Sequence, residues 1–222
     1  MALLLNIDTA IDSASICLAQ AGNVLGFEKN EKQKDHAAWL HIAIRDLFNS
    51  LNIKLNTLDA VAVTGGPGSY TGLRIGMAAA KGICYSLNKP LINLNTLTVL
   101  ANASHHKSSD LLCPMIDARR MEVFTALFNN KLEVVKEPSA MILDENSFEE
   151  ILKDQAISFF GNGSNKFRQM VKNENAIFED VTMDARSMVT LSEMRFKKRE
   201  FADLAYAEPL YLKEFYSPAG KS

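Results

Sequence analysis

The chain has 222 residues, of which 47% are hydrophobic and 23% charged, and its formal net charge is −2. This composition is typical of a globular protein with enough apolar material for one large domain or two lobes. A net charge near zero argues against autonomous nucleic-acid binding, which normally requires a strongly basic surface. Any role with nucleic acid is therefore expected to act through a partner or a local basic patch.

The cysteines and the start of the chain indicate a compartment. Cys17, Cys84 and Cys113 are far apart and form no CxxC pair. This pattern favours buried thiols in a reducing environment over a disulfide framework or a zinc site. The first residues lack the features of a signal peptide, and no stretch approaches the roughly 18 apolar residues of a membrane span. We therefore expect a cytoplasmic protein that does not associate with membranes.

The first half of the chain predicts a small sheet followed by alternating helices and strands. Apolar runs predict strands, whereas apolar residues at steps of three and four predict helices. The strands are expected at 3–8, 15–20, 24–29, 59–64 and 91–94, and the helices at 35–51, 71–87 and 96–103. Gly22-Asn23 is the expected hairpin turn, and Asp35 can cap the first helix.

The same order of elements begins again after a polar segment at 104–110, which contains His105 and His106. Strands are expected at 111–117, 121–129, 132–136 and 157–160, with helices at 144–153 and 166–172. Residues do not align between the halves, but the element order does. A duplicated unit of this kind is the plan of the actin-like and Hsp70-like (ASKHA) α/β folds. We therefore predict two lobes, 1–103 and 104–222, with a C-terminal segment that can return to the first lobe.

The clearest local motif is a strand that runs through glycines into a helix, VTGGPGSYTGLR at 63–74. The free N–H groups at such a helix start can bind an anion. The sequence is not a P-loop, because no lysine follows the glycines, and it misses GxGxxG by one residue, at Thr71. Two interpretations stay open. The motif is either an anion site with Ser69, Thr71 and Arg74, or a tight turn capped by Ser69 or Thr71.

A second candidate for anion contact is the charged hairpin at 115–123. Its Arg119 and Arg120 can grip a carboxylate or a phosphate. A surface turn with local ion pairs is the commoner explanation of such a cluster.

Neither a metal site nor an ATPase site is predicted. His36 and His41 are five residues apart, about 140° around a helix, so they cannot readily share one ion. The turn at 9–12 has no glycine to let a phosphate approach the backbone, and Asp12 would repel it. We therefore expect no bound cofactor and no catalytic residue.

The helix at 71–87 is apolar nearly all round, since only Arg74 and Lys81 are charged. Such a helix is buried on several sides, and in a small lobe one side can be buried by another chain. A ridge of small residues that would let a second helix come close is formed by Gly72, Gly76 and either Ala79 or Ala80. Packing within the chain is the alternative explanation.

The helix at 35–51 adds a tryptophan, which is a typical interface anchor. The two helices together predict a surface for a partner protein. The interface candidates are Trp39, Ile42, Ala43, Gly72, Ile75, Gly76, Ala79 and Ile83.

Several segments, in the same order across nearly the whole chain, resemble the TsaB (YeaZ-type) family. They are LNIDT at 5–9, DAVAV at 59–63, GGPGSYTGLRIG at 65–76, AKG at 80–82, IDARRMEV at 116–123, GNG at 161–163 and PLYLK at 209–213. Tyr70 and Lys213 are mild departures from the commoner Phe and Arg. The family is the bacterial paralogue of the TsaD transferase, and the GPGSYTGLRIG stretch is highly specific to it.

The resemblance implies an actin-like two-lobed fold without the metal-binding HxxxH pair of the catalytic paralogue. It implies a non-catalytic subunit that binds TsaD through first-lobe helices and acts with the ATPase TsaE. TsaD then adds threonylcarbamoyl to adenosine 37 of tRNA, so that this chain serves tRNA only indirectly. Without the partner, family members form homodimers through the same surface. The alternatives are a glycoprotease-like hydrolase and a stand-alone actin-like ATPase.

Overall fold

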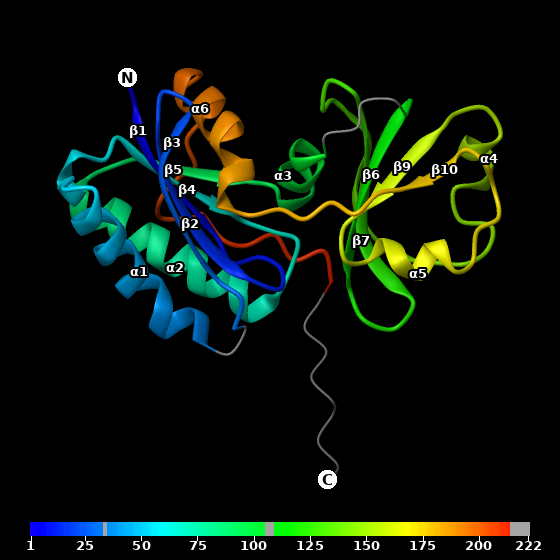
Figure 1. Cartoon of the computed structure of the whole chain (residues 1–222), viewed down its shortest axis with the longest axis horizontal. Helices are drawn as coiled ribbons and strands as arrows, with labels where there is room; N and C mark the ends of the chain where they lie inside the picture. Colours follow the sequence, from blue (N-terminus) through cyan, green and yellow to red (C-terminus); the bar gives the residue numbers. More distant parts are fainter. Residues whose placement is uncertain (33–34, 105–108, 214–222) are drawn as a thin grey trace, which may run out of the picture.

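The computed structural model describes residues 1–32, 35–104 and 109–213. It contains two five-stranded mixed sheets, each at the centre of its own lobe, with helices packed on their faces (Figure 1). His105 and His106, with part of the segment expected to join the lobes, lie outside the described residues. No helix among the described residues is long and apolar enough to cross a membrane.

The first sheet has the strand order β3-β2-β1-β4-β5. Its strands are β1 (Leu3–Asp8), β2 (Ala14–Gln20), β3 (Asn23–Asn30), β4 (Ala60–Thr64) and β5 (Leu91–Leu94). β1 pairs antiparallel with β2 across a short turn and parallel with β4, because a helix carries the chain back before β4 begins. β1 and β4 are buried throughout, as expected of central strands covered on both faces.

The second sheet has the order β10-β9-β6-β7-β8. Its strands are β6 (Leu111–Asp117), β7 (Glu122–Asn129), β8 (Val134–Ile142), β9 (Ile157–Phe160) and β10 (Ala176–Phe178). Written in reverse, this order places each strand where the first sheet has its counterpart. The predicted duplicated actin-like fold is therefore confirmed.

One face of the first sheet is covered by α1 (His36–Ser50) and α2 (Tyr70–Leu87). Leu5 and Ile7 of β1 pack there with Leu40 of α1 and Met77 of α2 in a single apolar cluster. These helices form because their apolar residues recur at helical spacing and face the sheet.

The opposite face of the first sheet meets α3 (Thr96–Ala103), the short helix η3 (Ala185–Met188) and α6 (Val189–Lys197). Figure 1 shows α3 between the two lobes. One continuous core runs from Leu4 of β1 through Leu100 of α3 to Phe128 of β7. The backbone N–H of Ala185 donates to Ser15 Oγ at 2.9 Å, so the chain comes back to the first sheet after the second lobe.

Several expectations about turns and about the ends of helices and strands were wrong. The first hairpin turn is Ala21-Gly22, both at positive φ, one residue earlier than expected. Asp35 is the residue before α1, but its side chain makes no cap hydrogen bond. The helix expected at 144–153 is only α4 (Glu149–Leu152), because Phe148 adopts a left-handed φ of 65° that interrupts a helix. The helix expected at 166–172 and the strand expected at 132–136 are found instead as α5 (Ser164–Arg168) and β8.

Candidate partner-binding site

The glycine-rich motif makes a tight, self-filled turn at the start of α2. Ser69 Oγ accepts a hydrogen bond from the N–H of Gly72 at 3.3 Å, which caps the helix. The N–H of Ser69 donates to the carbonyl of Ala10 at 2.7 Å. A carbonyl from the β1–β2 turn thus occupies the place where an anion would accept a hydrogen bond from this N–H. Of the two interpretations left open by the sequence, the structure favours the capped turn; Thr71 lies exposed just after it.

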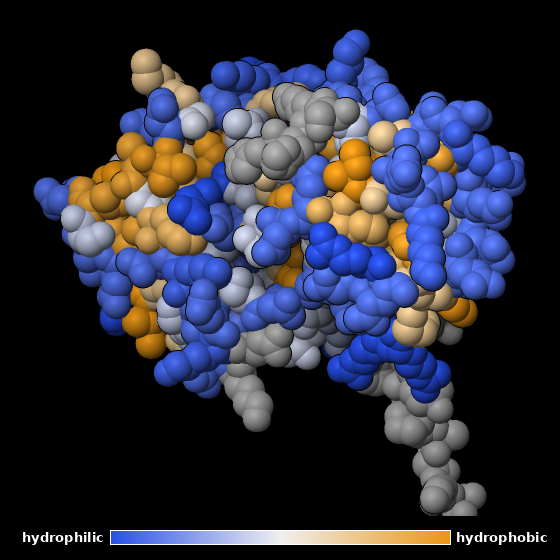
Figure 2. Space-filling view, turned by 45° about the vertical axis from the view of Figure 1, so that its right-hand side comes forward, coloured by the Kyte–Doolittle hydropathy of each residue, from blue (hydrophilic) through white to orange (hydrophobic). Residues whose placement is uncertain are grey.

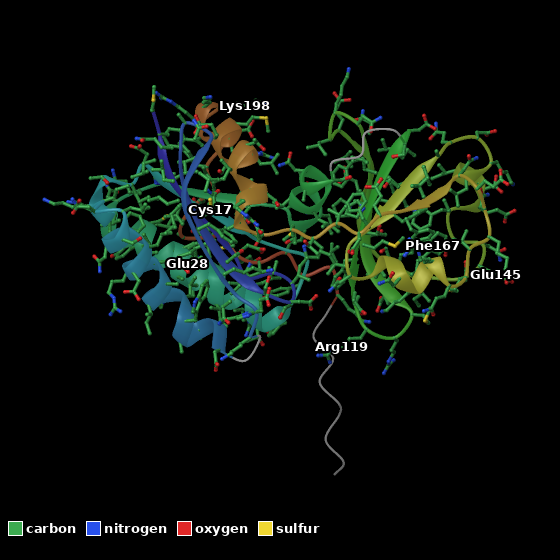
Figure 3. All side chains as sticks on the ribbon, viewed as in Figure 1. Cys17, Glu28, Arg119, Glu145, Phe167 and Lys198 are labelled. Carbon is green, nitrogen blue, oxygen red and sulfur yellow. The ribbon has the colours of Figure 1, made fainter. Side chains whose placement is uncertain are left out.

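The other residues considered for anion contact lie on separate lobes. The Arg74 guanidinium lies 4.0 Å from the centre of the Tyr70 ring, and its Nε donates to the Tyr211 hydroxyl at 3.1 Å. Arg119 and Arg120 lie exposed at the end of the β6–β7 hairpin, and Figure 3 places Arg119 at the lower edge of the molecule. The described contacts do not bring these three guanidinium groups together.

The two glycines of the predicted ridge face the chain's own sheet. A Cβ on Gly72 would overlap the carbonyl oxygen of Thr9, and a Cβ on Gly76 would overlap the Thr9 hydroxyl. That hydroxyl donates to the carbonyl of Gly72 at 2.7 Å. The expectation that these glycines make room for a second chain is therefore corrected, since the backbone of Thr9 approaches Gly72 and the side chain of Thr9 approaches Gly76.

The remaining interface candidates divide into buried and accessible residues. Ala43, Ala79 and Ile83 are buried in the cluster that joins α1 and α2 to the sheet. Trp39 and Ile75 are half-buried against this cluster, so the tryptophan named as an interface anchor is only partly exposed. Ile42 is 50% exposed. The accessible part of the predicted surface thus lies along Ile42, Trp39 and Ile75.

Sequence reasoning missed the residues that α2 turns outward. Ala78 and Gly82 are exposed, and a Cβ on Gly82 would have no atom within 4 Å. Tyr85, one turn further on, is 83% exposed. Thr71, Ala78, Gly82 and Tyr85 follow one another at steps of seven, four and three, so helical periodicity counted from the outward side would have found them. We call Thr71, Ala78 and Gly82 the outward strip of α2.

A hydrogen bond between polar side chains joins the two lobes. Asn162 Nδ2, in the loop before α5, donates to Asp12 Oδ2 of the β1–β2 turn at 2.9 Å.

At the end of β1, Asp8 is buried, and burial raises its pKa to about 6, although hydrogen bonds from the Ala10 N–H and the Thr64 hydroxyl lower it. Both of these bonds go to Asp8 Oδ1, at 3.1 and 2.8 Å.

The groups that could carry chemistry are dispersed. His36 is buried and His41 exposed, so their imidazoles lie on different sides of α1. Among the described residues, no three His, Cys, Asp or Glu side chains gather in a way that could hold a metal ion. Cys17, Cys84 and Cys113 are buried free thiols, and Figure 3 shows Cys17 inside the first lobe.

Comparison with known proteins decides the family. The model of the TsaD family, tRNA N6-adenosine threonylcarbamoyltransferase, matches residues 23–214. The tRNA threonylcarbamoyladenosine biosynthesis protein TsaB of Bacillus subtilis (strain 168) is 31% identical, over 95% of this chain and 93% of that protein. The chain belongs to the TsaB family. Its match to the TsaD model is consistent with the paralogy of TsaB and TsaD.

Solved structures agree with this TsaB fold. YeaZ from Pseudomonas aeruginosa has a TM-score of 0.79 and 22% identity, over 96% of this chain and 100% of that chain. An inorganic polyphosphate/ATP-glucomannokinase from an Arthrobacter strain has a TM-score of 0.51 and 9% identity, over 90% and 100% of the two chains. At these identities the likeness establishes the fold alone, and it places this TsaB-family chain in the same fold group as a sugar kinase.

Proposed function

We propose that this chain is a non-catalytic subunit that binds the TsaD transferase of its own organism, for the threonylcarbamoylation of adenosine 37 in tRNA. Its Bacillus subtilis relative is a tRNA threonylcarbamoyladenosine biosynthesis protein. The observation that carries the proposal is the outward strip of α2, whose small exposed residues are accompanied by the exposed Ile42 and the half-buried Trp39 of α1.

This surface has the properties that a helix of a partner requires. Ala78 and Gly82 present almost no side chain, so another helix backbone can come close to α2. Ile42, which is 50% exposed, and the half-buried Trp39 and Ile75 add apolar area along the α1 side. The surface therefore fits the contact between paired helices of two related chains.

One observation supports a subunit without nucleotide chemistry of its own. The carbonyl of Ala10 accepts a hydrogen bond from the N–H of Ser69 at the start of α2, where the fold offers an anion site. The hydrogen bond between Asn162 and Asp12 also joins the two lobes.

The wider assembly follows from the same proposal. The formal net charge of −2 favours contact with tRNA through TsaD rather than directly. TsaE is the proposed ATPase of the larger complex, and a cytoplasmic location is proposed with it. In the absence of TsaD, the exposed helices would pair with those of a second copy, giving a homodimer.

The test is size-exclusion chromatography with light scattering on the pure chain, alone and mixed with its own TsaD. We expect a heterodimer, and we expect Ala78→Arg to abolish it, because the long charged side chain would separate the helices. Ala78 is exposed, so the variant should keep its circular dichroism spectrum. Asn165→Arg, at an exposed position on α5 of the second lobe, is the matched control and should still bind. A wild-type chain that ignores TsaD would overturn the proposal.

Gly76→Arg is not a suitable probe of the interface, although the sequence alone recommends it. Thr9 occupies the space beside Gly76, so this variant would disrupt the first lobe itself. Titration calorimetry with ATP separates the ATPase alternative. We expect no heat of binding to the pure chain, and tight binding without a partner would favour the alternative.

A further inference from the structure

The two charged residues of α2 both hold the segment that follows α6. Lys81 Nζ donates to the carbonyls of Ala205 and Ala207, at 3.3 and 2.8 Å. Arg74 Nε donates to the hydroxyl of Tyr211 at 3.1 Å. We call residues 202–213 the strap; Figure 1 draws this segment in orange to red, leading from α6 toward the second lobe. The charged side of α2 is thus covered by the chain's own C-terminal region.

The strap is attached along its length. The N–H of Ala202 donates to the carbonyl of Leu91 at 2.8 Å, and the N–H of Leu210 donates to the carbonyl of Gly65 at 2.7 Å. Leu204 and Ala207 pack against the apolar cluster that contains α1 and α2. Backbone hydrogen bonds at both ends and apolar contacts between them give the strap a defined path beside α2.

One strap residue points away from this attachment. The carbonyls on either side of Tyr206 both accept from Lys81, and the Tyr206 side chain is 83% exposed. Tyr85 of α2 lies one turn after Lys81 and is also 83% exposed. A tyrosine so exposed leaves most of its ring area in water, which is a feature of interaction surfaces. The two tyrosines therefore flank the outward strip on the strap side, opposite Ile42 on the α1 side.

We propose that the strap is the second wall of the partner surface, and that Tyr85 and Tyr206 contact the TsaD subunit. This inference rests on the proposed function and extends it to residues outside the α1 and α2 candidates. In this arrangement a helix of the partner lies along Ala78 and Gly82, between Ile42 on one side and the two tyrosines on the other.

The area required by a stable interface supports this extension. Specific interfaces bury roughly 800 Å² on each partner. The outward strip contributes little of this area, because Thr71, Ala78 and Gly82 are small residues. Two tyrosines bury roughly 150–250 Å² each when fully covered, so together they would supply up to about half of the requirement.

The charges of this surface favour a protein as the occupant. Lys81 and Arg74 are the only cations of α2, and the described structure engages both with the strap. Binding to a nucleic acid would require cations directed at phosphates. The model of the TsaD family matches residues 23–214 of this chain, so the transferase can present a matching pair of helices, as expected for association between paralogues.

The experiment measures the dissociation constant of the heterodimer with TsaD by titration calorimetry, for Tyr85→Ala, Tyr206→Ala and the double variant. We expect each single change to weaken binding about tenfold and the double change more, as for aromatic contacts at interfaces. Ile142→Ala, at a 74% exposed apolar position on β8, is the matched control and should leave the constant unchanged. Melting temperatures of the free variants should match the wild type, because both tyrosines are exposed.

The outcomes separate this inference from the proposed function. If Ala78→Arg abolishes the heterodimer while both tyrosine variants bind as the wild type does, the strap is not part of the surface and the proposed function stands. If Ala78→Arg also binds normally, both proposals about this surface are wrong. If the tyrosine variants change only self-association in light scattering, the occupant is a second copy, and the inference about TsaD is overturned.

Discussion

Asn162 and Asp12 connect the two lobes, each of which contains its own sheet. The amide Nδ2 of Asn162 donates to Asp12 Oδ2 at 2.9 Å, across 150 positions of sequence. The bond is exposed, whereas the apolar core that contains α3 is buried and continues from one sheet to the other. The packing of α3 is therefore expected to hold the lobes together more strongly than this polar contact.

Leu100→Ala is expected to destabilise the protein far more than Asn162→Ala. Leu100 of α3 is buried and lies against Gly161 of the second lobe, so its removal leaves a cavity between the lobes. The cost should be about 2–5 kcal/mol, against about 0.5–1 kcal/mol for each of the two exposed hydrogen bonds of Asn162, which donates to Asp12 and accepts from the Asp117 N–H. Urea unfolding measures both, with Val135→Ala, at a 55% exposed position, as the control. A larger loss in Asn162→Ala would show that the polar contact dominates.

Two glycines of α2 should respond in opposite directions to alanine. A Cβ at position 76 would overlap the Thr9 hydroxyl, so Gly76→Ala should destabilise by about 1–3 kcal/mol. A Cβ at position 82 meets no atom within 4 Å, and Gly82→Ala should stabilise the helix by about 0.5–1 kcal/mol. Chemical denaturation of each variant tests the pair. Equal effects at the two positions would contradict the assignment of inward and outward sides.

Asp8→Asn is expected to stabilise the protein at neutral pH. Burial raises the pKa of Asp8 from 3.8 to about 6, so the folded state binds a proton that the unfolded state has lost. The bound proton contributes fully to the free energy of unfolding below pH 3.8, and this contribution is lost as the pH rises to about 6. A rise in pKa of this size corresponds to a change of about 3 kcal/mol at most in the free energy of unfolding. An asparagine keeps an oxygen for both hydrogen bonds, which the wild type directs to Oδ1.

Melting curves between about pH 4 and pH 8 provide the measurement for this variant. The advantage of Asp8→Asn should be largest at the alkaline end and should vanish at the acidic end. Asp180→Asn, at an exposed position, serves as the control and should follow the wild type. An advantage that does not depend on pH would mean that the carboxyl is not destabilised by burial.

The three thiols should be unreactive in the folded protein. Burial raises the pKa of Cys17 and Cys113 to about 12 and that of Cys84 to about 11, so almost no thiolate is present near neutral pH. A thiol-specific chromogenic reagent should therefore react slowly with the native chain and with all three cysteines after unfolding. Fast reaction of one thiol in the native chain would reveal local opening around it.

Most of the fold could be predicted from the sequence because its signals are local. Apolar runs identified β1, β4 and β5, and helical spacing identified α1, α2 and α3 within a few residues. The second lobe was harder at its helices, because α4 and α5 are very short and α4 begins only after the left-handed Phe148. β10, η3 and α6 were not predicted, since they have weak periodicity.

The sequence by itself determined the repeated element order and the family, because these depend on residues that are neighbours along the chain. Only the tertiary structure decided which side of α2 is available. A glycine indicates that another group comes close, but it does not say which one, and at Gly76 the neighbour is the Thr9 hydroxyl of the same chain. Likewise, the contact of Lys81 with Ala205 spans 124 positions. Contacts between residues so far apart in the sequence arise from packing of the whole chain, and no local pattern encodes them.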